Sequence, residues 1–148
     1  MNESEDVAKA STVKREEYNK ATIYKGPNVA SKPSDQLYIR AAKTDFGRVD
    51  YQIFAVINYR GTWRFYNWAY DADGNSLDLA VMTRNLDQCK SNDCAHNEDL
   101  VISVTKKYRE GNMDSGLRFW VSAKKEGVKE EFYIPSGYIK AFLSLSGD

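Results

Sequence analysis

The chain of 148 residues falls within the size range of a single domain, and its 42% of hydrophobic residues can form a core. Lysine plus arginine equal aspartate plus glutamate, at 21 each, so the formal net charge is zero. A nucleic-acid binder needs a surplus of cations to displace counterions from phosphates, and attachment to an anionic membrane surface needs a basic patch. The balanced charge argues against both, and we expect no nucleic-acid partner.

The hydropathy pattern gives evidence about the cellular location of the protein. No apolar run approaches the roughly 20 residues of a membrane-spanning helix, so we expect no transmembrane segment. The first residues, Met1 to Asp6, lack the basic start and the apolar stretch of a signal peptide. We therefore expect either a cytosolic protein or the mature part of an exported one.

Residues 1–20 are charged and polar, and we interpret them as a flexible N-terminal tether to a single β-rich domain of residues 21–148. In that domain, short apolar or alternating runs separated by turn residues predict strands. The strands are expected from Ile23 onward and then over residues 37–41, 51–59, 63–70, 77–81, 100–104, 117–123 and 132–134.

The segments between these runs predict how the strands connect. Arg60 to Thr62 indicates a tight reversal that pairs residues 51–59 with residues 63–70 as a hairpin. After Pro135, helical spacing of apolar residues predicts a terminal helix with Ser136 as its N-cap and Gly147 at its end. Because crossover helices are missing, we expect a mainly β fold: an antiparallel β-sandwich or curled sheet of about seven to eight strands with a short C-terminal helix.

Cys89 and Cys94 are the only cysteines, and the four residues between them suit a small disulfide loop. A disulfide is typical of an oxidising compartment. A zinc site is the alternative, because Asp87 precedes the pair and His96 and Glu98 follow it. Structural zinc sites usually have a second ligand pair, and redox pairs more often have two intervening residues. We expect a structural disulfide, and neither a metal nor another cofactor.

The chain holds few candidates for catalysis. His96 is the only histidine, and we interpret it as a surface residue of a polar loop. The carboxylate doublets Glu98-Asp99 and Glu130-Glu131 are expected to be solvated, because neighbouring residues of a strand point to opposite faces. We therefore expect no enzymatic activity.

The segment from Asp71 to Asn75, Asp-Ala-Asp-Gly-Asn, is similar to the start of a calcium-binding loop. The glycine of such a loop belongs at its sixth position, and the twelfth position, which should be glutamate, is Met82. We interpret the segment as a hairpin turn instead.

An aromatic strip is expected on the strand of residues 63–70. Alternation places Arg64, Tyr66, Trp68 and Tyr70 on one face and Trp63 and Phe65 on the other. If exposed, the strip could bind a glycan, a peptide or a protein. We favour the alternative that it packs under the terminal helix or against a second sheet. The candidate binding surface is this strip together with the loop that holds His96 and Glu98.

Several motifs resemble a group of small bacterial envelope proteins of the lipoprotein type. They are Asp71-Ala-Asp-Gly74 with Leu77, then Arg84, Cys89, Cys94 and Glu98, then Gly116-Leu117, and finally the run from Ile134 to Leu143. The resemblance covers roughly residues 50 to 145, and its most distinctive parts are the Cys-x4-Cys loop and the Ile-Pro-x-x-Tyr-Ile ending. The resemblance implies a periplasmic or lipid-tethered location. It implies no particular activity, because none is established for that group of proteins.

Three functional hypotheses follow. The first is a non-enzymatic exported domain that binds a protein or another envelope component. The second is an inhibitor or immunity protein that blocks a toxin or a cell-wall hydrolase, because rigid loops lose little entropy on binding. The third, which has the least support, is a zinc- or thiol-dependent module of Cys89, Cys94 and His96.

Overall fold

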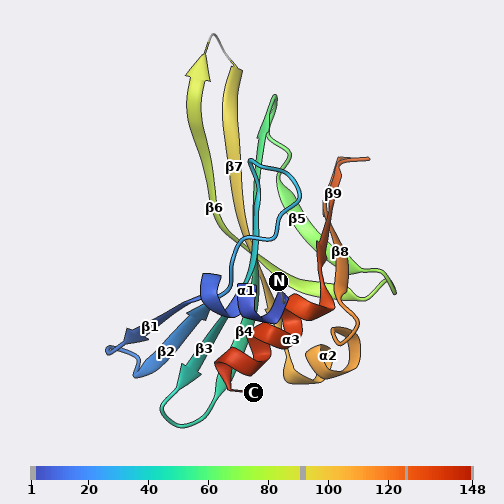
Figure 1. The fold of residues 1–148 in the computed structure, drawn as a ribbon. Coiled ribbons are helices and arrows are strands. Elements are labelled where there is room, and N and C mark those ends of the chain that lie inside the picture. Colours follow the sequence, from blue (N-terminus) through green and yellow to red (C-terminus); the bar gives the residue numbers. More distant parts are fainter. Residues whose placement is uncertain (1–2, 91–92, 126, 148) are drawn as a thin grey trace.

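The computed structural model describes residues 3–90, 93–125 and 127–147, and within them nine antiparallel strands form one open, curled sheet (Figure 1). The strands are β1 (Thr12–Glu16), β2 (Ala21–Lys25), β3 (Gln36–Thr44), β4 (Val49–Arg60), β5 (Tyr66–Asp71), β6 (Ser76–Lys90), β7 (Asp93–Val104), β8 (Leu117–Ala123) and β9 (Lys129–Ile134). Their order in the sheet is β1-β2-β3-β4-β7-β6-β5-β8-β9. The helices are α1 (Glu3–Ala10), α2 (Lys106–Asn112) and α3 (Ser136–Ser146). The expected mainly β fold with a terminal helix is confirmed.

The hairpin expected from residues 51–59 and 63–70 does not form. β4 pairs with β3 along one edge and with β7 along the other, from Tyr51↔Val104 to Arg60↔Ala95. β5 pairs instead with β6 and β8. Because both edges of β4 are already taken, the chain after Arg60 cannot return along it and crosses to the far side of the β6–β7 pair.

The core lies on one face of the sheet. Alternate residues of β4 are buried, from Tyr51 through Ile53, Ala55 and Ile57 to Tyr59, as expected for a strand with one face in the core. Helix α3 lies across this face beside α1 (Figure 1) and contributes side chains such as Phe142, which is fully buried. Burial of a side chain of this size contributes about 2 to 3 kcal/mol.

Residues 3–16 differ from the tether that the sequence suggested. Helix α1 packs against α3 and places Val7 in the core with 4% of its surface exposed. β1 then pairs with β2, from Thr12↔Lys25 to Glu16↔Ala21. The sparse apolar pattern concealed this packing, because one buried valine anchors the helix and β1 is held through its backbone.

The terminal helix begins at Ser136, the residue expected as its N-cap, so the observed cap lies one residue earlier than expected. Pro135 is the N-cap of α3 and makes no side-chain capping bond, whereas Gly147 ends the helix in the left-handed region, with φ 77°. From the first turn, the Tyr138 hydroxyl donates to the Pro27 carbonyl at 2.8 Å, and burial raises the pKa of Tyr138 to about 12. A Cβ atom at Gly26 would lie 2.1 Å from that hydroxyl, so glycine is required there. Among the described helices, none has the length and apolarity to cross a membrane.

Candidate functional site

Several connections gather at one end of the molecule, far from β1 and β2 (Figure 1). They are the β4–β5 connection of residues 61–65, the β6–β7 hairpin and the β8–β9 turn, and we call this region the loop end. β6, with 15 residues, is the longest strand and projects there together with β7. The loop end holds the half-exposed Phe65 and a hollow lined by four cationic side chains.

A buried carboxylate organises the loop end. Glu98 on β7 is 0% exposed and accepts hydrogen bonds from the Tyr59 hydroxyl, the Tyr66 backbone N–H at 2.9 Å and Arg84 Nε at 2.9 Å. The Nη2 of Arg84 also donates to the Tyr66 carbonyl at 2.8 Å. The expectation that Glu98 is a solvated charge is therefore wrong, because partners from three other strands satisfy it inside the protein.

The Tyr59 hydroxyl links this carboxylate to the β4–β5 connection. It donates to Glu98 and accepts from the Arg64 backbone N–H at 2.9 Å. Burial, followed by the hydrogen bond to the Glu98 carboxylate, raises the pKa of Tyr59 far above the usual value for a tyrosine. The phenol therefore stays protonated at neutral pH and remains a donor to Glu98.

Phe65 lies between these two anchored amides and has an unusual backbone. Its φ is 56°, in the left-handed region that costs a non-glycine residue about 1 kcal/mol or more. Its side chain is 52% exposed and stacks on the Trp63 ring, with centroids 5.6 Å apart. We call residues 63–65 the Trp63–Phe65 loop.

The packing beneath this loop includes the only histidine. His96 is 5% exposed, stacks on Tyr59 with centroids 5.2 Å apart and meets Trp63 edge to face at 4.5 Å. Its Nδ1 lies 2.9 Å from the Cys94 carbonyl, to which it can donate. The expectation of a surface histidine is wrong, because His96 belongs to β7 and shares the inner face of that strand with Glu98.

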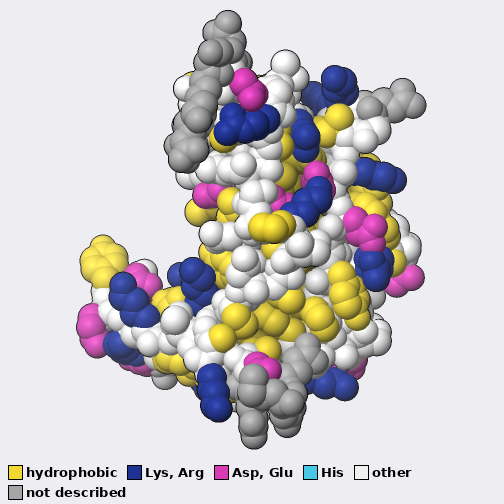
Figure 2. Space-filling view, turned by 45° about the horizontal axis from the view of Figure 1, so that its top comes forward, with side chains coloured by type: hydrophobic (Ala, Val, Ile, Leu, Met, Phe, Trp, Pro, Cys, Tyr) yellow, Lys and Arg dark blue, Asp and Glu magenta, His cyan; other side chains and the backbone are white. Residues whose placement is uncertain are grey.

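A cationic hollow adjoins the loop, with a volume of about 470 Å³. Its lining residues are Trp63, Arg64, Phe65, Asn67, Arg84, Lys124 and Lys125, among which there is no aspartate or glutamate. The Arg84 guanidinium lies over the Phe65 ring at 5.2 Å, and the Arg64 guanidinium lies over the Tyr59 ring at 4.1 Å. Figure 2 shows lysine and arginine side chains among hydrophobic ones in the upper half of the view.

The expected aromatic strip is divided between two faces. A bulge between Tyr66 and Trp68 shifts the register of β5 against β8. Tyr66 is therefore 0% exposed in the core, whereas Trp68 is 51% exposed on the opposite face, where it contacts Tyr70. Tyr70 stacks on Trp120 of β8 at 5.7 Å. Arg64 precedes the strand and lines the hollow.

The expected disulfide between Cys89 and Cys94 is confirmed and joins β6 to β7 near the end of their hairpin. Because both sulfurs are bonded to each other, neither can act as a thiolate ligand for zinc in this state. Within the described residues, no three His, Cys, Asp or Glu side chains come together as metal ligands. The side chain of Asp87 lies outside the part of the chain that the structure describes.

The segment from Asp71 to Asn75 forms the turn between β5 and β6, as expected. Asp71 Oδ1 accepts from the backbone N–H groups of Asp73 and Asn75, and Oδ2 accepts from the Tyr108 hydroxyl at 2.6 Å. Burial alone would raise the pKa of Asp71, but the bonds from Tyr108, Asn75 and Asp73 outweigh it and lower the pKa below its usual value. Protein donors thus occupy the oxygens that a calcium ion would need.

No protein-family model, curated protein or solved structure matches this chain. The functional inference therefore depends on the loop end itself. Sequence reasoning missed Lys124 and Lys125 as site residues, although two adjacent lysines beside a turn are a recognisable basic signal. It also missed the role of Phe65, for which the sequence carries no signal, since nothing distinguishes a phenylalanine with positive φ from any other.

Proposed function

We propose that the chain is a non-enzymatic domain exported to a bacterial cell envelope, where it binds a protein or another envelope component through the Trp63–Phe65 loop and the cationic hollow. The observation that carries this proposal is the strained backbone of the half-exposed Phe65. A backbone of this kind persists only where its surroundings enforce it, and such strain gathers at ligand-contacting sites. Here the enforcing groups are the buried Glu98 and Tyr59, which hold the amides on both sides.

The hydrogen bonding beneath the loop favours binding over catalysis. The two candidates for proton transfer, Glu98 and His96, are buried and have partners within the protein. A general base must reach a substrate proton within about 3 Å, and these groups lie below the aromatic rings. Their arrangement supports a role in positioning the loop.

Two features support export. The Cys89–Cys94 disulfide is typical of proteins from oxidising compartments. The resemblance to bacterial envelope proteins of the lipoprotein type points the same way and favours a periplasmic protein or one tethered to the outer membrane.

A second candidate function is inhibition of a toxin or a cell-wall hydrolase. The β6–β7 hairpin supports it, because this long projection is closed by a disulfide near its end and would lose little entropy on entering a partner's cleft. Inhibition of a purified cell-wall hydrolase that is lost in a C89S/C94S variant would favour this candidate over the first.

Hydrogen–deuterium exchange tests the proposed binding surface. Bacterial envelopes would be separated into protein, polysaccharide and lipid-vesicle fractions, and exchange would be measured with each at saturation. We expect a binding fraction to slow exchange of the amides in residues 61–67 and in the β8–β9 turn. Protection confined to β1 and β2, or to the outer face around Trp68 and Trp120, would contradict the proposed surface.

A further inference from the structure

We propose that the cationic hollow binds a phosphate monoester carried on a sugar ring. This inference rests on the proposed function, since it names the chemical class of ligand that the same surface takes. The phosphorylated sugar can be a soluble molecule or the head group of an envelope glycolipid, because both present the same chemistry to the hollow.

The charges of the lining favour a dianion. Four cations line the hollow, and two of them have acidic partners. Arg84 pairs with Glu98 at 2.9 Å, and Arg64 pairs at 3.4 Å with Glu130, which it shares with Lys32 at 2.6 Å. Lys124 and Lys125 form no ion pair with any other described residue. Within the described part of the chain, the charges of these two lysines therefore remain uncompensated, which matches the charge of about −1.5 to −2 on a phosphate monoester at pH 7. A single carboxylate would balance only one of them.

The arginines are held in place before any ligand arrives. Glu98 and the Tyr66 carbonyl fix the guanidinium of Arg84 through Nε and Nη2. The Tyr66 hydroxyl, at 3.0 Å, and Glu130 fix Arg64 through Nη1. Among the described residues, Arg84 Nη1 and Arg64 Nη2 have no hydrogen-bond partner, so each arginine keeps N–H groups to donate to phosphate oxygens. Pre-ordered donors lose little entropy on binding.

The aromatic rings and the size of the hollow favour a sugar as the carrier of the phosphate. The Phe65 ring is 52% exposed, although Trp63 stacks on it and the Arg84 guanidinium lies over it, and it offers apolar surface beside the cations for C–H groups of a pyranose. The volume of about 470 Å³ lies within the range of small-molecule sites. A bare phosphate would leave this aromatic surface unused and should bind more weakly.

The test is calorimetric titration of the full chain with glucose-1-phosphate, inorganic phosphate and glucose. A parallel arm uses phosphatidylcholine vesicles with and without a monophosphorylated glycolipid. We expect saturable binding of glucose-1-phosphate, weaker binding of phosphate and none of glucose. Binding to the glycolipid vesicles alone would also support the inference and would identify a lipid-linked ligand.

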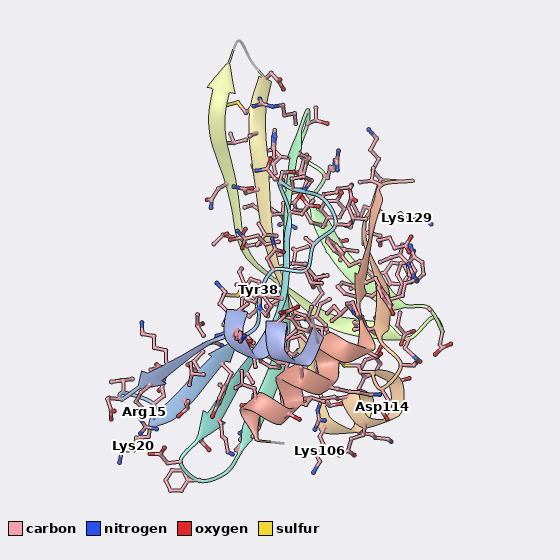
Figure 3. All side chains as sticks on the ribbon, in the orientation of Figure 1. Arg15, Lys20, Tyr38, Lys106, Asp114 and Lys129 are labelled. Carbon is pink, nitrogen blue, oxygen red and sulfur yellow. A yellow bond between two sulfur atoms is a disulfide. The ribbon has the colours of Figure 1, made fainter. Side chains whose placement is uncertain are left out.

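A charge-reversal variant and pH locate the interaction. K124E/K125E should weaken binding by about tenfold or more, because it replaces both uncompensated charges. K106E/K107E is the matched control in α2. Lys106 lies at the bottom of the view in Figure 3, well below Lys129 of β9, and this variant should bind normally. Affinity should fall between about pH 7.5 and about pH 5, because the second phosphate pKa is near 6.

Two results would overturn the inference. One is failure of all phosphate probes to bind. The other is binding of an Asp/Glu-rich peptide with an affinity that stays constant down to about pH 5. Carboxylates, whose pKa values are near 4, would give this pH profile. Such binding would identify an acidic protein segment as the ligand. If an envelope fraction still protects residues 61–67 from exchange, only the ligand class is wrong; protection elsewhere would contradict the proposed function itself.

Discussion

The fully buried carboxylate of Glu98 accepts a hydrogen bond from the backbone N–H of Tyr66 at 2.9 Å. This contact joins β7 to the first residue of β5, although the two strands do not pair with each other. A side chain thus connects two strands here, as backbone hydrogen bonds between paired strands do elsewhere in the sheet. It fixes the point at which the chain enters β5 and thereby the conformation of the preceding Phe65.

The first prediction concerns this carboxylate. Glu98→Ala should lower the free energy of unfolding by about 3 to 5 kcal/mol, because it leaves the partly buried Arg84 charge and the Tyr59 hydroxyl without their partner. Urea denaturation measures the change. Asp99→Ala, at the next residue and on the opposite face of β7, should cost about 0.5 kcal/mol or less. Equal costs for the two variants would contradict the organising role of Glu98.

The second prediction concerns the turn between β5 and β6. Because hydrogen bonds lower the pKa of Asp71, this residue stabilises the fold above its unfolded-state pKa of about 3.9, and the contribution is lost as the pH falls through the lower folded-state value. Asp71→Asn should therefore cost about 1 to 3 kcal/mol at neutral pH. The difference between variant and wild type should shrink at acidic pH. Thermal unfolding from neutral to acidic pH measures it, and a difference that does not change with pH would contradict this account.

The third prediction concerns the disulfide. A C89S/C94S variant should remain folded and lose about 2 kcal/mol, because a short loop removes little entropy from the unfolded chain. Chemical denaturation with and without reductant gives the value, and the variant should be insensitive to reductant. The binding of envelope fractions should persist in the variant if the Trp63–Phe65 loop is the contact surface. Loss of binding without loss of stability would favour the hairpin as the contact surface instead.

Local sequence patterns predicted the features that depend on neighbouring residues. The alternation of Leu117, Phe119 and Val121 gives the bounds of β8, and the residue types from Asp71 to Asn75 give the turn. The spacing of Cys89 and Cys94 gives the disulfide. In each case the pattern of residue types lies within a few residues along the chain, so it is visible in the sequence.

The candidate site could not be predicted in this way, because its contacts join distant segments. From the sequence alone, Glu98 is interpreted as a surface charge. Its partners Arg84 of β6 and Tyr59 of β4 are distant along the chain and meet it only in the folded protein. The bulge that buries Tyr66 and exposes Trp68 carries no glycine or proline to mark it. Among the residues of the expected binding surface, Arg64 lines the hollow, whereas His96 and Glu98 are buried beneath the Trp63–Phe65 loop. Only the folded sheet brings these residues together.

The measurement that tests the central claim most directly is the stability and envelope binding of a Phe65→Asn variant. Asparagine tolerates positive φ better than phenylalanine, so the variant should keep its stability to within about 1 kcal/mol while the exposed ring is removed. Phe46→Asn is the matched control, because Phe46 is 91% exposed in the turn between β3 and β4. We expect Phe65→Asn to abolish binding and Phe46→Asn to leave it unchanged. A stable Phe65→Asn variant that binds as well as the wild type would contradict the claim that the Trp63–Phe65 loop is the binding site.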